Sequence, residues 1–143
     1  MPRIVPQGSI LGPLLFLVFI NDLPSAIPNS VVDIYADDTT CSSSSHYSLG
    51  VTELQSNLQL DMECLFEWSV QIHMVLNTDK TKSILVSGKR LRSRLDTLDL
   101  QLNGTTIEQV TSQKLLGVTL DEGLSFKDYV EKLCEKLSKK MDC

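Results

Sequence analysis

Two adjacent carboxylates, Asp37 and Asp38, are the residues of this chain best placed to do chemistry. They follow a run of Val, Ile and Tyr at residues 31–35 that favours a β-strand, and the Ser and Thr residues after them permit a turn and a second, weaker strand. Because neighbouring side chains of a regular strand point to opposite faces, both carboxylates reach one site only if the chain turns at them. The pair therefore indicates either an ordinary turn or a divalent-metal site at the tip of a hairpin.

The composition is that of one globular domain with an uneven distribution of charge. The 143 residues are 42% hydrophobic and 22% charged, and the net charge is -5. An acidic chain argues against a polyanionic partner. One stretch is nevertheless basic, with no acid from residue 80 until Asp96. Its cations, called the basic strip below, are Lys80, Lys82, Lys89, Arg90, Arg92 and Arg94. The strip indicates either a solvated loop or a nucleic-acid contact.

The cysteines and histidines do not show the spacing of a metal site or of a disulfide framework. None of the four cysteines forms a C-x-x-C pair, and only two histidines are present, so a zinc site is not expected. We expect reduced thiols in an intracellular protein. The four cysteines are Cys41, Cys64, Cys134 and Cys143.

The N-terminus allows one competing interpretation, a secretory leader. Arg3, the apolar run 14–20 and the small pair Ser25-Ala26 have the order of such a leader. The run is too short to span a bilayer; Pro6–Ser9 precede it and the polar pair Asn21-Asp22 follows it. We therefore expect a protein that is neither secreted nor embedded in a membrane.

Hydrophobic periodicity predicts the elements that position the acidic pair. A helix is expected from Gly12-Pro13 to Ile20, and because its apolar residues lie on all sides we expect it to be buried. The capping box Thr52–Gln55 opens a second helix, with Trp68 in the core near its end. The apolar face of this helix is formed by Leu54, Leu58, Met62, Leu65 and Trp68.

The second half of the chain is expected to be rich in short strands. Asn77–Lys80 predicts a turn, and Asn103-Gly104 between alternating runs predicts a hairpin. Ser125, with Asp128 three residues later, opens a final helix whose cations lie toward its C-terminus. The strands are expected at 72–76, 83–86, 98–102, 105–110 and 114–120.

Four motifs, taken in order, resemble the reverse transcriptases of non-long-terminal-repeat retrotransposons. They are Pro6–Phe16, Tyr35-Ala36-Asp37-Asp38, Leu76–Lys82 and Lys114–Asp121, and the resemblance extends from residue 4 to about residue 140. It implies an α+β fold, in which helices cover an antiparallel palm-type sheet and a β-hairpin and a truncated thumb helix follow. The implied parts are a partial palm at 1–88, the basic linker, hairpin and primer-grip-like strand at 89–122, and the start of the thumb at 123–143.

The same resemblance implies an RNA-directed DNA polymerase that transfers nucleotides by two-metal chemistry. Asp37 matches the family's metal-binding aspartate and Asp38 its neighbour, so both are expected as catalytic residues and as ligands of Mg²⁺. Tyr35 matches a residue near the primer end. Gln7 and Gly8 match a loop that lies against the template strand and the nascent base pair.

Two further motifs complete the implied machinery. Lys80 matches a lysine that protonates or stabilises the departing pyrophosphate, and Leu116-Gly117 matches the hairpin that grips the primer. The implied partners are an RNA template, a DNA primer and deoxynucleoside triphosphates.

The sequence also departs from the family pattern. The family carries another metal-binding aspartate on a strand before the P-Q-G loop, and basic fingers, whereas Met1 lies five residues before Pro6. Asp22 and Asp33 are candidate substitutes by composition only. We therefore expect these 143 residues alone to be inactive and to aggregate through an uncovered sheet edge and helix face. The alternatives are a non-catalytic retroelement remnant and a residual nucleic-acid-binding module.

Overall fold

The computed structural model describes residues 11–46, 50–92, 95 and 97–141, which belong to two compact units. The first unit comprises the chain up to Leu76 together with Leu100–Asn103, and the second comprises Asn77–Asp99 and the chain from Gly104 onward. Each unit contains helices and strands, so the fold is α+β. The described strands form four separate two-stranded sheets. The expected palm-type sheet and the expected boundaries after residues 88 and 122 remain predictions.

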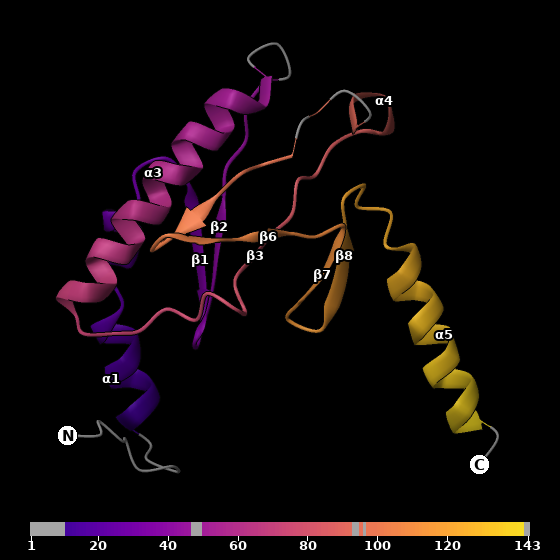
Figure 1. The fold of residues 1–143 in the computed structure, drawn as a ribbon. Coiled ribbons are helices and arrows are strands. Elements are labelled where there is room, and N and C mark those ends of the chain that lie inside the picture. The colour runs from indigo at the N-terminus through magenta and orange to yellow at the C-terminus, as the bar shows by residue number, and fades with distance from the viewer. Residues whose placement is uncertain (1–10, 47–49, 93–94, 96, 142–143) are drawn as a thin grey trace. The chain divides into compact units, whose positions relative to one another are not determined.

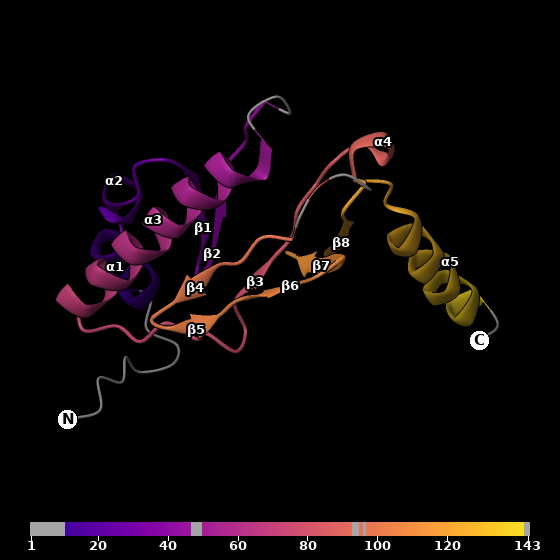
Figure 2. The ribbon, with the colours of Figure 1, turned by 45° about the horizontal axis from the view of Figure 1, so that its top comes forward.

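In the first unit, a long helix lies along a β-hairpin (Figure 1). The hairpin strands β1 and β2 are antiparallel, and in the described residues they pair only with each other. Figure 2 shows the two short helices α1 and α2 beside the long helix α3. The elements of this unit are α1 (Leu11–Phe19), α2 (Leu23–Ala26), β1 (Val31–Tyr35), β2 (Asp38–Ser42), α3 (Gly50–Gln71) and β4 (Gln101–Leu102).

One face of the hairpin completes the core of this unit. Alternation along β1 turns Val32 and Ile34 inward and leaves Val31 and Tyr35 exposed. The inward residues pack against a cluster formed by Ile20, Leu23, Ile27 and Trp68, each less than 7% exposed. The expected core position of Trp68 is confirmed, and α3 is thereby attached to the hairpin.

Helix α1 is present where it was expected, but the expectation that it is buried is wrong for this chain. A helix that is apolar on all sides needs partners all round, and the described residues cover it only near Phe16 and Ile20. None of the described helices is both long and apolar enough to cross a membrane. The apolar residues of α1 that are 45–70% exposed are Leu11, Leu14, Leu15, Leu17, Val18 and Phe19.

The second unit is built from short strands and one amphipathic helix. Strand β3 pairs with β6 in parallel, and β7 and β8 form an antiparallel hairpin. The elements of this unit are β3 (Lys82–Ser83), α4 (Lys89–Arg92), β5 (Thr105–Thr106), β6 (Glu108–Gln109), β7 (Ser112–Leu115), β8 (Val118–Asp121) and α5 (Lys127–Met141).

The turn at Asn103-Gly104 confirms the hairpin that this dipeptide predicted. Both residues have positive φ, 51° and 73°, as a type I′ turn requires, and they connect β4 to β5. The strands on either side are shorter than expected, with two residues each.

Three other expectations about strands and helices differ from the structure. Residues 72–76 form no strand, because the chain there closes α3 in a Schellman motif: Met74 N bonds to Ser69 O, and His73 has a φ of 57°. Helix α3 begins at Gly50, so Thr52 lies inside the helix instead of capping it. The single strand expected at 114–120 is the β7–β8 hairpin.

The exposed surface of α1 leads to a test of association. We expect the paired substitution Leu15→Lys and Val18→Lys to raise the monomeric fraction of the chain, because both side chains are more than 60% exposed and belong to one apolar patch. Size-exclusion chromatography with light scattering measures the change. Ile20→Lys is the matched control and should reduce the monomeric fraction, because Ile20 is 4% exposed. A wild-type chain that melts cooperatively as a monomer would contradict this expectation.

Candidate active site

The chain turns at the acidic pair, as a shared site requires. Tyr35 pairs with Asp38, which leaves Ala36 and Asp37 as a two-residue loop. Ala36 has a φ of 52°, in the left-handed region that hairpin turns of this length require at their first position. For a residue other than glycine this conformation costs about 1–2 kcal/mol. Both carboxylates are exposed at the tip.

The two faces of the hairpin have different chemistry. Because paired residues share a face, Tyr35, Asp38 and Asp33 lie together on the open face, with Asp33 a diagonal neighbour of Asp38. Cys41 lies on the core face. Burial raises the pKa of the Cys41 thiol to about 11, and the negative charge of Asp61 adds to this effect. The thiol is therefore protonated at neutral pH and is not a nucleophile.

Asp37 and Asp38 supply hard oxygen ligands of the kind that Mg²⁺ prefers. Among the residues that the structure describes, no group of three or more His, Cys, Asp or Glu side chains is arranged to hold a metal ion. Asp22, a candidate by composition, instead accepts a hydrogen bond of 3.2 Å from Trp68 Nε1. The assignment of Asp37 and Asp38 as ligands of Mg²⁺ therefore remains a prediction.

A buried carboxylate on α3 holds the base of the hairpin. Asp61 is 0% exposed and accepts hydrogen bonds from Asn29 N and Nδ2, each at 3.0 Å, and from Ser30 Oγ. These three donors compensate for burial of the charge. Asp61 was not among the expected site residues. One sequence signal marks it: it is an acid within the apolar face of α3, three residues after Leu58 and four before Leu65.

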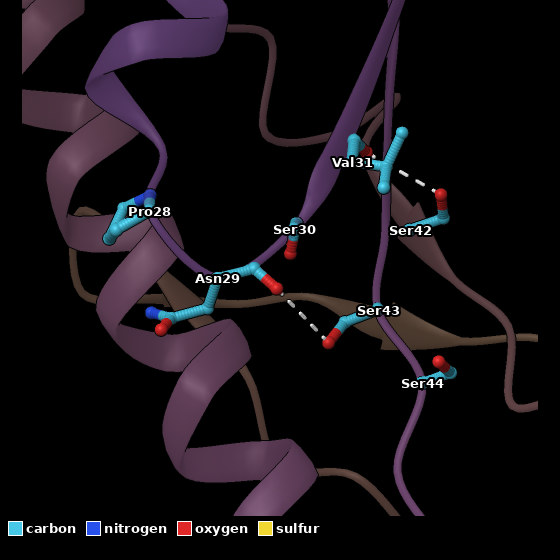
Figure 3. A pocket seen from close by; sticks show the side chains of 7 residues that line it. All are labelled: Pro28, Asn29, Ser30, Val31, Ser42, Ser43 and Ser44. Atoms are coloured by element: carbon cyan, nitrogen blue, oxygen red, sulfur yellow. Dashed lines mark hydrogen bonds between the residues drawn. The ribbon is translucent and has the colours of Figure 1, made fainter.

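A shallow hollow of about 450 Å³ lies beside this base (Figure 3). The Ser43 hydroxyl donates to the carbonyl of Asn29 and the Ser42 hydroxyl to the carbonyl of Val31, each at 3.4 Å. These two bonds connect the end of β2 to the start of β1. The residues that line the hollow are uncharged, and their visible role is to support the hairpin.

Lys80 lies in the second unit, in the turn that the sequence predicts. Asn77 builds this turn: its Oδ1 accepts a bond of 3.1 Å from Lys80 N, and its carbonyl accepts one of 2.8 Å from Thr81 Oγ1. The Lys80 side chain is exposed, and its catalytic role remains a prediction. Gln7 and Gly8 lie outside the described residues.

Leu116 and Gly117 form the two-residue loop of the β7–β8 hairpin. Their φ values are 47° and 90°, so both central positions are left-handed, as in a type I′ turn. Glycine adopts this conformation freely, whereas Leu116 does not, and its side chain is 58% exposed. The geometry is that of a tight, exposed loop, and its role on the primer remains a prediction.

Part of the basic strip is occupied by internal ion pairs. Lys82 Nζ lies 2.6 Å from Glu108 Oε2 across the β3–β6 pair. Arg92 Nη1 lies 2.8 Å from Glu122 Oε1, and its Nη2 donates to Ser87 O at 3.1 Å. The described cations of the strip that have no such tie and are exposed are Lys80, Lys89 and Arg90.

A second structural carboxylate, Asp121, fixes the junction between β8 and α5. It accepts bonds from Gly123 N, Ser125 N, Ser125 Oγ and Phe126 N at 2.8–3.0 Å. The bond from Ser125 N, with the others, lowers the pKa of Asp121 to about 2. Helix α5 begins at Lys127, two residues after the start expected at Ser125.

The family model described as "Reverse transcriptase (RNA-dependent DNA polymerase)" matches residues 2–120, which include the acidic hairpin, Lys80 and the β7–β8 loop. The chain belongs to the reverse transcriptase family. Enzymes of this family use divalent metal ions. Several relatives of this chain are reverse transcriptase proteins of non-long-terminal-repeat retrotransposons, which confirms the resemblance that the four motifs predicted.

Three relatives show the extent of the similarity. The RNA-directed DNA polymerase from mobile element jockey of Drosophila melanogaster is 32% identical over 88% of this chain and 14% of the relative. The probable RNA-directed DNA polymerase from transposon BS of the same species is 31% identical over 99% of this chain and 16% of the relative. A retrovirus-related Pol polyprotein from type-1 retrotransposable element R1 2 of Nasonia vitripennis is 27% identical over 94% of this chain and 33% of the relative.

This reverse transcriptase segment therefore spans about a seventh of the jockey polymerase that it matches. No solved structure matches it significantly.

The ties of Arg92 lead to a stability test. We expect Arg92→Met to lower the free energy of unfolding by about 1 kcal/mol, because it leaves Glu122 and the carbonyl of Ser87 without their partner. Lys89→Met, the control on the same helix, should change it by less than about 0.5 kcal/mol. Urea denaturation measures both. Equal effects of the two variants would contradict the assignment of Arg92 as an internal tie.

Asp121 leads to a prediction of pH dependence. Because folding lowers its pKa from 3.8 to about 2, its bonds stabilise the β8–α5 junction fully above about pH 4, and this contribution is lost as the pH falls through about 2. We expect the carboxyl carbon signal of Asp121 to titrate with a midpoint near 2 in NMR spectra. Amide exchange at Ser125 and Phe126 should accelerate over the same range, and Asp121→Asn should accelerate it at neutral pH. A midpoint near 3.8 would show that the bonds do not form.

Proposed function

We propose that this chain is the part of an RNA-directed DNA polymerase that carries the metal-binding hairpin of a palm-type domain. One observation carries the proposal: Tyr35–Asp38 form the tip of a two-residue β-turn at which two carboxylates meet solvent. The reverse transcriptase match across residues 2–120 supports it. Since the chain spans a small share of its relatives, the proposed activity, substrates and partners are those of the whole enzyme.

The proposed role of Asp37 and Asp38 is to hold divalent metal, with Mg²⁺ as the ion. When bound, magnesium in such a site stabilises the developing charge on the attacking and leaving oxygens of a phosphoryl group. Asp37 lies in the turn and Asp38 at the first position of β2, on the open face, and the proposal is that both contribute oxygen atoms to one metal site. Magnesium keeps several waters or substrate phosphates, which accords with a partial protein ligand set.

The remaining assignments follow the chemistry of each group. Tyr35 is 66% exposed on the face of Asp38 and offers an aromatic surface to the primer end. Lys80 offers a compact cation to departing pyrophosphate. The Leu116-Gly117 loop offers backbone groups to the primer, and Gln7 with Gly8 is proposed to lie against the template RNA. Deoxynucleoside triphosphates are the proposed substrates.

A nucleic-acid-binding module without catalysis is the alternative function, for which the exposed pair Lys89 and Arg90 is the supporting observation. With Lys82 and Arg92 occupied by Glu108 and Glu122, the available positive charge is small. Salt-dependent RNA retention that survives Asp37→Asn but is lost in Lys89→Met with Arg90→Met would favour this alternative.

The proposal is tested by transplanting the chain into a relative. Residues 2–120 replace the matching segment of the jockey polymerase, and DNA synthesis on an RNA template is measured against magnesium concentration. We expect the chimera to extend a primer and Asp37→Asn to slow it at least about a hundredfold, since a lost metal ligand removes several kcal/mol of transition-state stabilisation. Asp38→Asn should have a smaller effect.

Glu67→Gln, at an exposed acid on α3, is the matched control and should leave the rate unchanged. A folded chimera whose rate is insensitive to Asp37→Asn would refute the proposal. We expect the isolated 143 residues to give no extension under the same conditions, and extension by them would overturn that expectation.

A further inference from the structure

The segment that leads into the hairpin, residues 22–30, is held at both ends by one face of α3. At its start, Trp68 Nε1 donates to Asp22 Oδ1 at 3.2 Å. At its end, the Asp61 carboxylate accepts from Asn29 and Ser30. Asp61 and Trp68 are seven residues apart, which places them on one side of the helix two turns from each other.

The Asp61 end of this segment lies directly before the strand that ends in the acidic pair. Ser30 is followed by Val31, the first residue of β1, and five strand residues separate Ser30 from the loop. Within the described residues β1 and β2 have no third strand beside them, so their direction depends on the core face and on this base. A two-stranded hairpin alone is marginally stable in water.

Burial makes Asp61 a specific anchor. Its side chain is 0% exposed, so water cannot replace a lost donor, and each oxygen has a partner from the segment: Asn29 N and Nδ2 at Oδ1, and Ser30 Oγ at Oδ2. Bonds to both oxygens fix the orientation of the carboxylate plane as well as its distance from the backbone.

We propose that Asp61 is a positioning residue for the metal-binding hairpin: from α3 it sets the direction in which β1 carries Asp37 and Asp38, without touching metal or substrate. This inference rests on the proposed function of the hairpin. Groups that orient metal ligands from outside the site typically change metal affinity or activity about ten- to a hundredfold when removed.

The test uses three variants. Asp61→Asn keeps the shape but turns an amide N–H toward donors. Asn29→Ala removes only the Nδ2 donor and leaves the backbone N–H at position 29 and Ser30 Oγ bonded to Asp61. Met62→Ala is the matched control. It truncates the neighbouring side chain, which is 7% exposed, and so destabilises the packing of α3 while leaving the bonds from Asp61 to residues 29 and 30 in place.

Two readouts on the full chain separate positioning from simple support. The first is amide hydrogen exchange across β1 and β2, compared between variants at equal free energy of unfolding. That free energy is measured by the fluorescence of Trp68, the single tryptophan. The second is the Mn²⁺ concentration that broadens the NMR signals of residues 35–38, with Mn²⁺ as a paramagnetic replacement for Mg²⁺. In the jockey chimera, the magnesium concentration for half-maximal extension gives a third comparison.

We expect Asp61→Asn to accelerate exchange in the hairpin and to raise the required Mn²⁺ about ten- to a hundredfold. Asn29→Ala should change both readouts in the same direction by a smaller factor, because two of the three bonds remain. Met62→Ala should change neither readout once stability is matched. If Asp61→Asn and Met62→Ala behave alike, Asp61 is a packing residue and the inference is wrong. If wild type shows no Mn²⁺ effect at residues 35–38, the proposed metal function fails, and hydrogen exchange alone decides whether Asp61 positions the hairpin.

Discussion

Three hydrogen bonds to the buried carboxylate of Asp61 tie the base of the β1–β2 hairpin to α3. The first unit depends on this connection because a lone hairpin gains little from its own pairing. The apolar cluster around Trp68 holds one face of the sheet, but apolar contact has no direction. Asp61 and the Trp68–Asp22 bond supply the direction, so the polar ties define how the strand leaves the core.

The chain uses carboxylates in two ways that their hydrogen-bond donors distinguish. Asp61 and Asp121 each accept hydrogen bonds from several donors of the chain itself, so their side chains are held in place and have a structural role. Asp37 and Asp38 stand at an exposed turn. Carboxylates that a fold leaves in solvent at a turn are available to an external cation, which is the role proposed for this pair in the reverse transcriptase segment.

Much of this arrangement was predictable from sequence because it is local. The strand 31–35, the turn at the acidic pair and the hairpin at Asn103-Gly104 follow from propensity and turn chemistry. The expected strand at 72–76 failed because the end of α3 recruits those backbone groups into its cap. Asp61 was not foreseen, since its partners lie more than thirty residues away and sequence spacing does not report such contacts.

Side chains along β2 alternate between the core face and the open face of the hairpin. Cys41 faces the core while Asp38 and Thr40 face outward, and a two-residue loop holds this phase. Insertion of a single residue between Asp38 and Cys41 would exchange the faces of everything beyond it, turning a hydroxyl inward and a thiol outward. Length changes in this stretch are therefore costlier than most substitutions.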